Sequence, residues 1–452
     1  MSSEWPVVPV DQVCDLIVDC VNKTAPAVTH QTPYRMIRTT NVRNGRIDLA
    51  DCKYVEKETF EKWTRRAKLQ RGDVVLTREA PIGEVGLVTE ADGVFLGQRL
   101  MQYRANRKVL EPRFLLYSFL APALQHQFGS HEGSGSVVSH IRVGDCFKFK
   151  LPIPPLDVQQ GIATLLGALD DRITLLRETN ATLEAIAQAL FKSWFVDFDP
   201  VRTKLEGRAP EGIDEATAAL FPDAFEESGL GLVPRGWRLV PFGQLLVHTI
   251  GGDWGDEARS DKNDTRVAII RGTDIPDLRH GENNRVPIRY TAAKKLVSRK
   301  LQHGDIVLEV SGGSKDQPTG RSLYITDGLL RQFDCPVEPA SFCRLLRPKS
   351  EQIGLMLGLH LSQIYAQGKT WEYQNQSTGI ANFQTTHFLE TELVAVPTDE
   401  VLDKFARTVR PMIERGHVAQ MRILRELRDT LLPRLISGQL RLTDVEAEAL
   451  AA

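Results

Sequence analysis

Several features that decide the cellular setting of a protein are missing from this sequence. No stretch approaches about 18 consecutive apolar residues, which excludes a membrane-spanning helix. The first residues, MSSEWPVVPVDQVC, lack the basic start and the apolar run of a secretory signal, so we expect a cytoplasmic protein with no membrane partner. None of the six cysteines forms a C-x-x-C pair, a pattern typical of free thiols in a reducing compartment.

The motifs that carry catalysis are missing as well. The glycine-rich stretch 312–320 does not end in the Gly-Lys-Ser/Thr that cradles phosphates, and His131-Glu132 is not followed by a second histidine one turn later. No serine or cysteine lies in a nucleophile motif. Neither a methyl-donor glycine motif nor an Asn/Asp-Pro-Pro-aromatic tetrapeptide is present. We therefore predict no catalytic residue, no metal and no cofactor in this chain, which favours a binding or scaffolding subunit.

A large charge of one sign is also absent. The 56 basic and 58 acidic residues leave a formal net charge of −2, which at first argues against a nucleic-acid partner. By region, however, residues 1–155 carry +4 and residues 236–397 carry +1, whereas 197–235 holds nine acidic and four basic residues. A mild positive excess therefore lies outside the acidic connection, and we expect the chain alone to bind DNA weakly.

What the sequence does contain is an internal repeat. Trp5, Val8 and Pro9 recur 232 residues later as Trp237, Val240 and Pro241. Each copy begins with short strand-like runs separated by Gly and Pro and ends in a helix-period segment. Because four collinear matches do not arise by chance, we predict an internal duplication. The other matches are 36–42 with 269–275, 69–90 with 301–327, and 135–155 with 377–397.

The helix-period segment of each copy predicts a coiled-coil seam. In the first copy the apolar spacing is 4, 3, 4, 3 over four heptads, and in the second Pro411 interrupts the pattern, so that helix should kink or restart there. Asn180, His417 and Gln420 are polar seam positions, which favours a register-setting role over a metal site. The predicted seams are Ile162, Leu166, Leu169, Ile173, Leu176, Asn180, Leu183, Ala187 and Leu190, and Ile413, His417, Gln420, Leu424, Leu427 and Leu431.

Two similar globules, each followed by a seam helix, fold most simply with a pseudo-twofold relationship and antiparallel helices. Helices of this length span roughly 40–60 Å, and B-DNA advances about 34 Å per turn, so two globules could face one duplex about a turn apart. The copies have diverged between their shared motifs. The expected target is therefore two dissimilar half-sites with a fixed gap.

At this point the sequence resembles the DNA-specificity subunits of type I restriction–modification systems. The most specific stretch is LPIPPLDVQQGIATLLGALDDRITLLRETNATLEAIAQALFKSWFVDFDPV (151–201), and the GWRLVP start of the second half and LLPRLISGQL (431–440) are also typical. The resemblance implies two target-recognition domains, two modification subunits that bind S-adenosylmethionine and methylate adenine, and a restriction subunit that uses ATP with Mg. Double-stranded DNA is the implied substrate, and the cofactors would belong to the partner subunits.

The expected fold is α+β, with two globular α/β target-recognition domains joined by two long helices in an antiparallel coiled coil. The expected boundaries are 1–155 for the first domain, 156–196 for the first helix, 197–235 for a surface linker, 236–397 for the second domain, 398–440 for the second helix and 441–452 for a tail.

Base reading needs Arg, Lys, Asn or Gln at loop tips, and an ordinary solvated loop is the alternative for each such residue. A second apolar stripe on the first helix favours a partner surface, with packing against the chain's own globules as the alternative. A coiled-coil scaffold that binds only proteins is the rival function. The candidate DNA-contacting residues are Arg78, Gln98, Arg99, Lys315, Gln317, Arg321, Lys369, Tyr373, Gln374 and Gln376; the candidate partner-binding residues are Leu165, Ile186, Phe191, Trp194 and Phe195.

Overall fold

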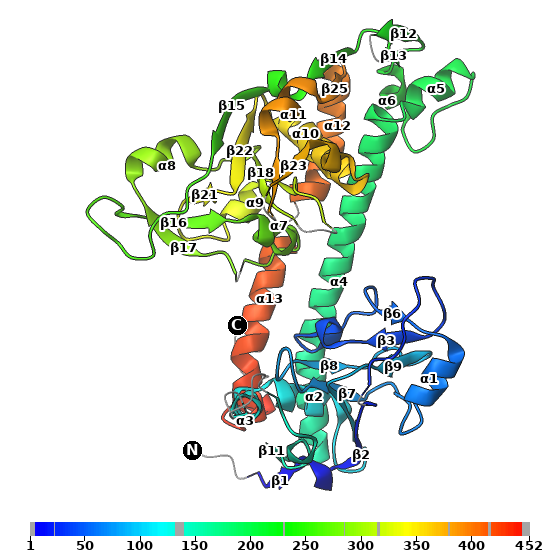
Figure 1. Cartoon of the computed structure of the whole chain (residues 1–452), viewed down its shortest axis with the longest axis vertical. Helices are drawn as coiled ribbons and strands as arrows, with labels where there is room; N and C mark the ends of the chain where they lie inside the picture. The colour runs from blue at the N-terminus through cyan, green and yellow to red at the C-terminus, as the bar shows by residue number, and fades with distance from the viewer. Residues whose placement is uncertain are drawn as a thin grey trace. The chain divides into compact units, whose positions relative to one another are not determined.

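The computed structural model divides into two compact units, shown with their elements labelled in Figure 1. Unit 1 comprises Met1–Arg172 with Leu424–Ala452, and unit 2 comprises Ile173–Ile423. Each unit therefore contains one part of each long helical segment. The structure describes residues 5–21, 23–131, 140–228, 231–283, 285–313, 317–377, 380–414 and 417–444.

Unit 1 is built on a four-stranded antiparallel sheet in the order β2-β10-β7-β8. A second sheet, β6-β3-β9, contains the parallel pair β3–β9, and β1 pairs with β11. The central strands are short apolar runs buried on both faces, as VVLT in β7 shows. The strands are β1 (Val7–Pro9), β2 (Cys14–Asp19), β3 (Arg35–Ile37), β6 (Lys53–Tyr54), β7 (Val74–Thr77), β8 (Val85–Leu87), β9 (Val94–Leu96), β10 (Leu100–Ala105) and β11 (Lys150–Pro152), with the hairpin β4 (Val42–Arg43) and β5 (Arg46–Ile47).

Unit 2 repeats the strand order of both sheets and the pairing of the first and last strands. Its main sheet has the order β15-β22-β18-β20, its second sheet β17-β16-β21 contains the parallel pair β16–β21, and β14 pairs with β25. The predicted internal duplication is thus confirmed by two independent sheets in each unit. The strands are β14 (Arg238–Pro241), β15 (Leu246–Gly251), β16 (Thr265–Ile270), β17 (Ile288–Thr291), β18 (Ile306–Glu309), β20 (Ser322–Tyr324), β21 (Val337–Pro339), β22 (Cys343–Pro348) and β25 (Leu393–Val396); unit 2 adds the sheet β19 (Ser311–Gly312), β24 (Ile380–Phe383) and β23 (Gln374–Ser377).

Short helices cover the sheets and complete the cores. In unit 1, Phe114 and Phe119 of α2 join Tyr103 of β10 in one buried cluster, and Tyr103 and Phe119 meet edge to face. In unit 2, α10 takes the corresponding place, with Met356 and Leu357 fully buried. The helices are α1 (Lys57–Trp63), α2 (Pro112–Leu120) and α3 (Pro122–Gly129) in unit 1, and α7 (Ile275–Arg279), α8 (Ala293–Arg299), α9 (Asp327–Leu330), α10 (Glu351–Ala366) and α11 (Thr385–Thr391) in unit 2.

The acidic stretch 197–235, expected to be a surface connection, instead contributes to the core of unit 2. Val201 and Phe221 are buried there together with Trp237. Pro200 lies in the first turn of a new helix, where a proline is tolerated. The elements of this stretch are α5 (Asp199–Leu205), α6 (Glu215–Ala219), β12 (Phe225–Ser228) and β13 (Gly231–Pro234).

The long helices are α4 (Leu156–Phe195), α12 (Asp399–Glu414) and α13 (His417–Ile436), and they pack antiparallel within each unit. In unit 1, Ile162 of α4 shares a core with Leu435 of α13, while Asp170, further along α4, pairs with Arg428, which precedes Leu435. In unit 2, the ring centres of Phe195 on α4 and Phe405 on α12 lie 4.6 Å apart. The predicted packing of the long helices is therefore confirmed.

The predicted seam holds a buried face on α4 but not on α13. Every predicted α4 position is buried or half-buried. On α13, Gln420 and Leu427 are exposed, which contradicts their assignment to the seam; Met421, Leu432 and Leu435 are buried instead. The phase counted from Ile413, which lies near the end of α12 (Asp399–Glu414), does not match the buried residues of α13, which begins at His417. Ile413, Leu424 and Leu431 are half-buried, and the side chain of His417 lies outside the described residues.

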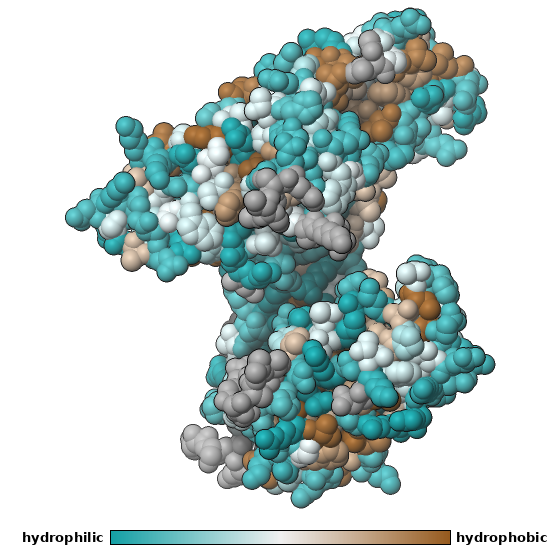
Figure 2. Space-filling model, in the orientation of Figure 1, coloured by the Kyte–Doolittle hydropathy of each residue, from teal (hydrophilic) through white to brown (hydrophobic). Residues whose placement is uncertain are grey.

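No helix in the described part of the chain is long and apolar enough to cross a membrane. Hydrophilic residues also dominate the face of the molecule seen in Figure 2. All six cysteines are free thiols, as predicted from their spacing.

Candidate nucleic-acid interface

Three loops of unit 1 meet at one end of the main sheet. They follow β2, β7 and β9, and backbone and side-chain hydrogen bonds connect them. The Arg78 amide donates to the Arg99 carbonyl at 2.8 Å, and the Thr24 hydroxyl donates to the Gln98 side-chain oxygen at 3.0 Å. The sequence candidates Arg78, Gln98 and Arg99 are thus brought together by the fold, although they come from two separate loops.

These three side chains differ in how far they are free to read a base. The Arg99 side chain is 50% exposed, its backbone has φ of 70°, and its Nε lies 3.0 Å from the Glu79 carboxylate. Gln98 beside it is half-buried. Arg78 folds back instead, because its Nη1 donates to the Ile141 carbonyl at 3.1 Å and its Nε is buried. Gln98 and Arg99 stay candidates, whereas Arg78 supports the loop.

The corresponding loops of unit 2 meet in the same way. The amides of Val310 and Ser311 both donate to the Phe342 carbonyl, at 2.9 and 3.2 Å, and the Gly252 amide donates to the Cys343 carbonyl at 3.0 Å. Phe342 follows β21 as Arg99 follows β9, and 60% of it is exposed. The equivalent loop tips therefore present an arginine in one unit and a phenylalanine in the other.

The extra sheet of unit 2 carries the remaining polar candidates. Gln317 is exposed, and the side-chain oxygen of Gln374 accepts hydrogen bonds from the Thr319 amide at 3.1 Å and its hydroxyl at 3.2 Å. Gln374 thus holds the loop that follows β19 rather than presenting itself to a ligand. Lys315 and the side chain of Gln376 lie outside the described residues.

Three of the candidate residues bind buried carboxylates of unit 2. Arg321 donates from Nε to the Glu309 carboxylate at 2.9 Å and from Nη2 to its second oxygen, and Glu309 is buried. Lys369 and Tyr373 both bind the buried Glu392, at 2.7 and 2.6 Å. A buried carboxylate requires such partners, so these three side chains stabilise unit 2, and their contact with DNA stays a prediction.

Glu392 is held in its charged form by this group. Burial tends to raise the pKa of its carboxyl, but hydrogen bonds from His360, Lys369 and Tyr373 outweigh burial and lower the pKa to about 2. Lys369 and Tyr373 looked like loop residues because their partner, Glu392, lies some 20 positions later in the sequence, at the end of α11. No local sequence pattern reveals a contact over that separation.

The predicted partner-binding stripe is also largely buried by the chain itself. Phe191, Trp194 and Phe195 are at most 6% exposed and pack in the core of unit 2, so they are not a partner surface. Leu165 is half-buried against the core of unit 1. Ile186 is 42% exposed and stays a candidate.

Sequence reasoning missed a basic segment that precedes the central strand in each unit. Residues 62–71 (KWTRRAKLQR) contain five basic and no acidic residues, and residues 294–300 (KKLVSRK) contain four basic and none acidic. Both segments adjoin the loop that follows the first strand of the main sheet. The Trp63 indole donates to the Lys23 carbonyl at 3.1 Å, and Arg299 Nε donates to the Gly251 carbonyl at 3.0 Å.

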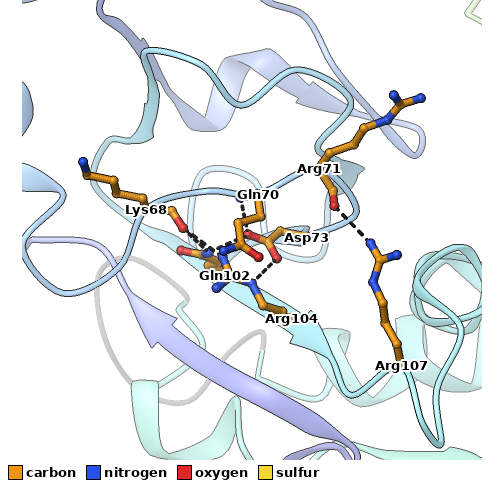
Figure 3. Close-up of polar contacts among 7 residues, drawn as sticks. All are labelled: Lys68, Gln70, Arg71, Asp73, Gln102, Arg104 and Arg107. Atoms are coloured by element: carbon orange, nitrogen blue, oxygen red, sulfur yellow. Dashed lines mark hydrogen bonds and ion pairs between the residues drawn. The ribbon is translucent and has the colours of Figure 1, made fainter.

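A buried ion pair anchors the turn at the end of each basic segment, as Figure 3 shows for unit 1. Asp73 accepts from Arg104 Nε at 2.9 Å and Nη2 at 2.8 Å, and from the Gln70 amide at 2.7 Å. Arg104 Nη2 also donates to the Lys68 carbonyl at 2.8 Å. The aligned LQRGD and LQHGD motifs were the available signal for this anchor.

Unit 2 has the same anchor. Asp305 accepts from Arg347 Nε and Nη2, both at 2.8 Å, and from the Gln302 amide at 2.7 Å, while Arg347 Nη2 donates to the Lys300 carbonyl at 2.9 Å. Asp73 and Asp305 are at most 2% exposed as side chains. We call these two groups the Asp–Arg clips.

One cluster in the described residues meets the distance criteria for a metal, but its hydrogen bonds argue against one. His303, Glu351 and Glu414 place their ligand atoms within 4.8 Å of one another. His303 Nδ1 accepts from the Asp327 amide at 3.1 Å, which puts the imidazole proton on Nε2, the atom that faces the carboxylates. Arg410 Nη2 lies 3.0 Å from Glu351 and already balances its charge.

Comparison with known proteins shows which family this chain resembles. Residues 2–185 match the family model described as the type I restriction modification DNA specificity domain. The chain is 26% identical over 420 residues to the type I restriction enzyme HindI specificity subunit of Haemophilus influenzae, covering 82% of this chain and 87% of that one. It is 24% identical over 413 residues to the MjaIX specificity subunit of Methanocaldococcus jannaschii, covering 88% and 86%. Over most of its length this chain is thus similar to type I restriction–modification specificity subunits.

A solved structure supports the fold of this chain. The crystal structure of the S subunit from M. genitalium matches 96% of both chains with a TM-score of 0.52 at 15% identity.

Proposed function

We propose that this chain is a specificity subunit and reads a bipartite, asymmetric DNA target through its two units, each of which recognises one half-site. The observation that carries the proposal is the repeated topology with different exposed side chains at equivalent loop tips, Arg99 in unit 1 and Phe342 in unit 2. An arginine pairs with guanine edges in the major groove, whereas a phenylalanine makes apolar contact with a thymine methyl group or a base step. Two such modules should therefore prefer different bases.

The fixed gap between the half-sites would follow from the long helices. α4 is uninterrupted from Leu156 to Phe195, and its residues contribute to the cores of both units. A linker of polar coil would let the gap vary, whereas a continuous helix has a set rise of about 1.5 Å per residue. We propose the functional boundaries 1–155, 156–196, 197–235, 236–397, 398–440 and 441–452, with 197–235 as part of unit 2.

The chemistry would be supplied by partner subunits. Two modification subunits that carry S-adenosylmethionine would methylate adenine, and a restriction subunit using ATP with Mg would join them. Within this chain, Leu175 and Ile186 on α4 support a docking role, because they are 51% and 42% exposed while the neighbouring aromatic residues are buried. Their spacing of eleven residues places them on one side of the helix.

Mapping of methylated adenine in the host genome, with and without this gene, tests the proposal. The expected result is the loss of one bipartite motif on deletion and its return when the gene is restored. An unchanged set of methylated motifs, in cells that express the modification subunits, would contradict the role. The rival function, a scaffold that binds only proteins, predicts that unchanged result together with no specific duplex affinity in the assembled complex.

A further inference from the structure

The two Asp–Arg clips hold the same exposed residue at the same place in both units. In each clip an arginine from the neighbouring strand binds the backbone carbonyl of a lysine, Lys68 in unit 1 and Lys300 in unit 2. The two lysines are 232 residues apart, like the two aspartates. Because a buried group holds its carbonyl, the backbone of each lysine has a defined position, although its side chain is exposed.

Lys68 and Lys300 have no acidic partner in the described part of the chain, because the nearby aspartates are fully engaged by Arg104 and Arg347. Figure 3 shows the Lys68 side chain pointing away from the Asp73 carboxylate. One other basic residue of each segment is neutralised: Arg66 pairs with Asp19, and Lys295 pairs with Asp253 at 2.8 Å. Each clip therefore leaves an unneutralised ammonium group at the surface.

The two units share these lysines while their loop tips differ. Modules that read different sequences can share only contacts with what every sequence has in common, which is the phosphate backbone. An ammonium group on a flexible stem suits a phosphate, a point charge, better than the planar edge of a base. The basic segments also adjoin the loops that follow β2 and β15, next to the candidate base-reading tips.

From these observations we infer that Lys68 and Lys300 are equivalent phosphate contacts, one for each half-site, and that the Asp–Arg clips position them. The inference rests on the proposed DNA-reading function and assigns its backbone contacts. It predicts that both lysines contribute to affinity for any duplex, whether or not the duplex carries the target motif.

The test measures the salt dependence of binding by the assembled complex of this chain with its modification subunits. The probes are a 40-base-pair duplex that carries the motif found by methylation mapping and a scrambled duplex of the same composition. Each neutralised phosphate contributes about 0.9 to the slope of log affinity against log salt concentration. We expect Lys68→Ala and Lys300→Ala each to reduce the slope by about 0.9, the double variant by about 1.8, and the change to be the same on both duplexes.

Matched variants distinguish a phosphate contact at Lys68 and Lys300 from a general effect of removing one positive charge. Lys150→Ala and Arg238→Ala remove one exposed positive charge from each of the equivalent ribbons β1–β11 and β14–β25, and should leave the slope unchanged. Lys68→Arg and Lys300→Arg should retain it, since arginine keeps the charge. The inference would be overturned by an unchanged slope in the double alanine variant, or by a loss confined to the motif-bearing duplex. If the wild-type complex does not distinguish the two duplexes, the proposed function fails while the slope still decides the role of the lysines.

Discussion

Asp170 on α4 and Arg428 on α13 are joined within unit 1 by an ion pair of 2.8 Å, although 258 residues separate them in the sequence. The second oxygen of Asp170 accepts the Tyr117 hydroxyl at 2.8 Å, and its backbone carbonyl accepts Arg46 Nη2 at 3.0 Å. Burial and the nearby Asp170 raise the pKa of Tyr117 well above its usual value. The carboxylate of Asp170 thus connects both long helices with α2, and its backbone carbonyl adds β5.

The variant Asp170→Asn should lower the free energy of unfolding by about 2–3 kcal/mol, because it removes the less exposed of the two carboxylates that pair with Arg428 and leaves only Asp429, whose side chain is 63% exposed. The adjacent Asp171→Asn is a matched control. Asp171 pairs with Arg113 at the surface, with 64% of its side chain exposed, so its loss should cost less than about 1 kcal/mol. Urea denaturation of the two variants measures the difference, and equal losses would contradict the role of Asp170.

Each Asp–Arg clip should stabilise its own unit. Asp73→Asn leaves Arg104 unpaired and should speed amide exchange in β7 and β10, whereas Asp305→Asn should do so in β18 and β22. We expect a loss of about 3 kcal/mol from each, since one partner of a buried pair stays behind. Hydrogen exchange read out by mass spectrometry localises the effect. Exposed Asp92→Asn is the control, and protection lost equally in both units by either variant would contradict the prediction.

Glu392 predicts a loss of stability in acid. Its folded-state pKa of about 2 lies below that of an unfolded glutamate, so its contribution is present above about pH 4.5 and is lost as the pH falls toward 2. Glu392→Gln should lower stability at pH 7 and flatten the decline between pH 5 and 3. Urea midpoints across this range test the prediction against Glu390→Gln, an exposed neighbour that should behave like the wild type.

Glu338 on β21 predicts the opposite dependence. Its side chain is fully buried, and neither carboxyl oxygen has a hydrogen-bond partner. Burial, and then the nearby Asp253, raise the pKa of this carboxyl to about 7. Arg299, Lys295 and Thr291 act in the opposite direction. The folded state therefore binds a proton that the unfolded state has released, and stability should fall as the pH rises from about 5 to 7. Glu338→Gln should remove this fall and stabilise the protein at pH 8. A wild-type urea midpoint that does not change from pH 5 to pH 8 would contradict the assigned shift.

The duplication and the long helices were predictable from the sequence because both leave periodic signals. Residues such as Trp5 and Trp237 recur at one offset, and the α4 seam repeats every three or four residues over a single unbroken helix. The phase of the predicted α13 seam was wrong, because Gln420 and Leu427 are exposed while Met421 is buried; two of its six predicted positions are polar, so the apolar spacing was too sparse to fix the phase. The role of 197–235 was missed because its buried Val201 and Phe221 are isolated among polar residues.

The interface was predictable only in part. Loop position suggested Arg78, Gln98 and Arg99 one by one, but neither their meeting in the fold nor their exposure follows from it, because both depend on distant partners. Arg321, Lys369 and Tyr373 are occupied by Glu309 and Glu392, and no spacing rule links those pairs. The basic segments were visible as a composition bias, yet their importance depends on Arg104 and Arg347, which approach from another strand.

The central claim, that each unit reads its own half-site, is tested most directly by the methylome of a unit 1 loop variant. In Gln98→Ala/Arg99→Ala, the exposed Arg99 and the half-buried Gln98 of one loop tip lose their polar groups while unit 2 is unchanged. Single-molecule sequencing of host DNA gives the methylated fraction for every base at every motif position. We predict relaxed base preference in one half-site only, with the other half-site and the gap retained. Relaxation in both half-sites, or none in either, would contradict the account.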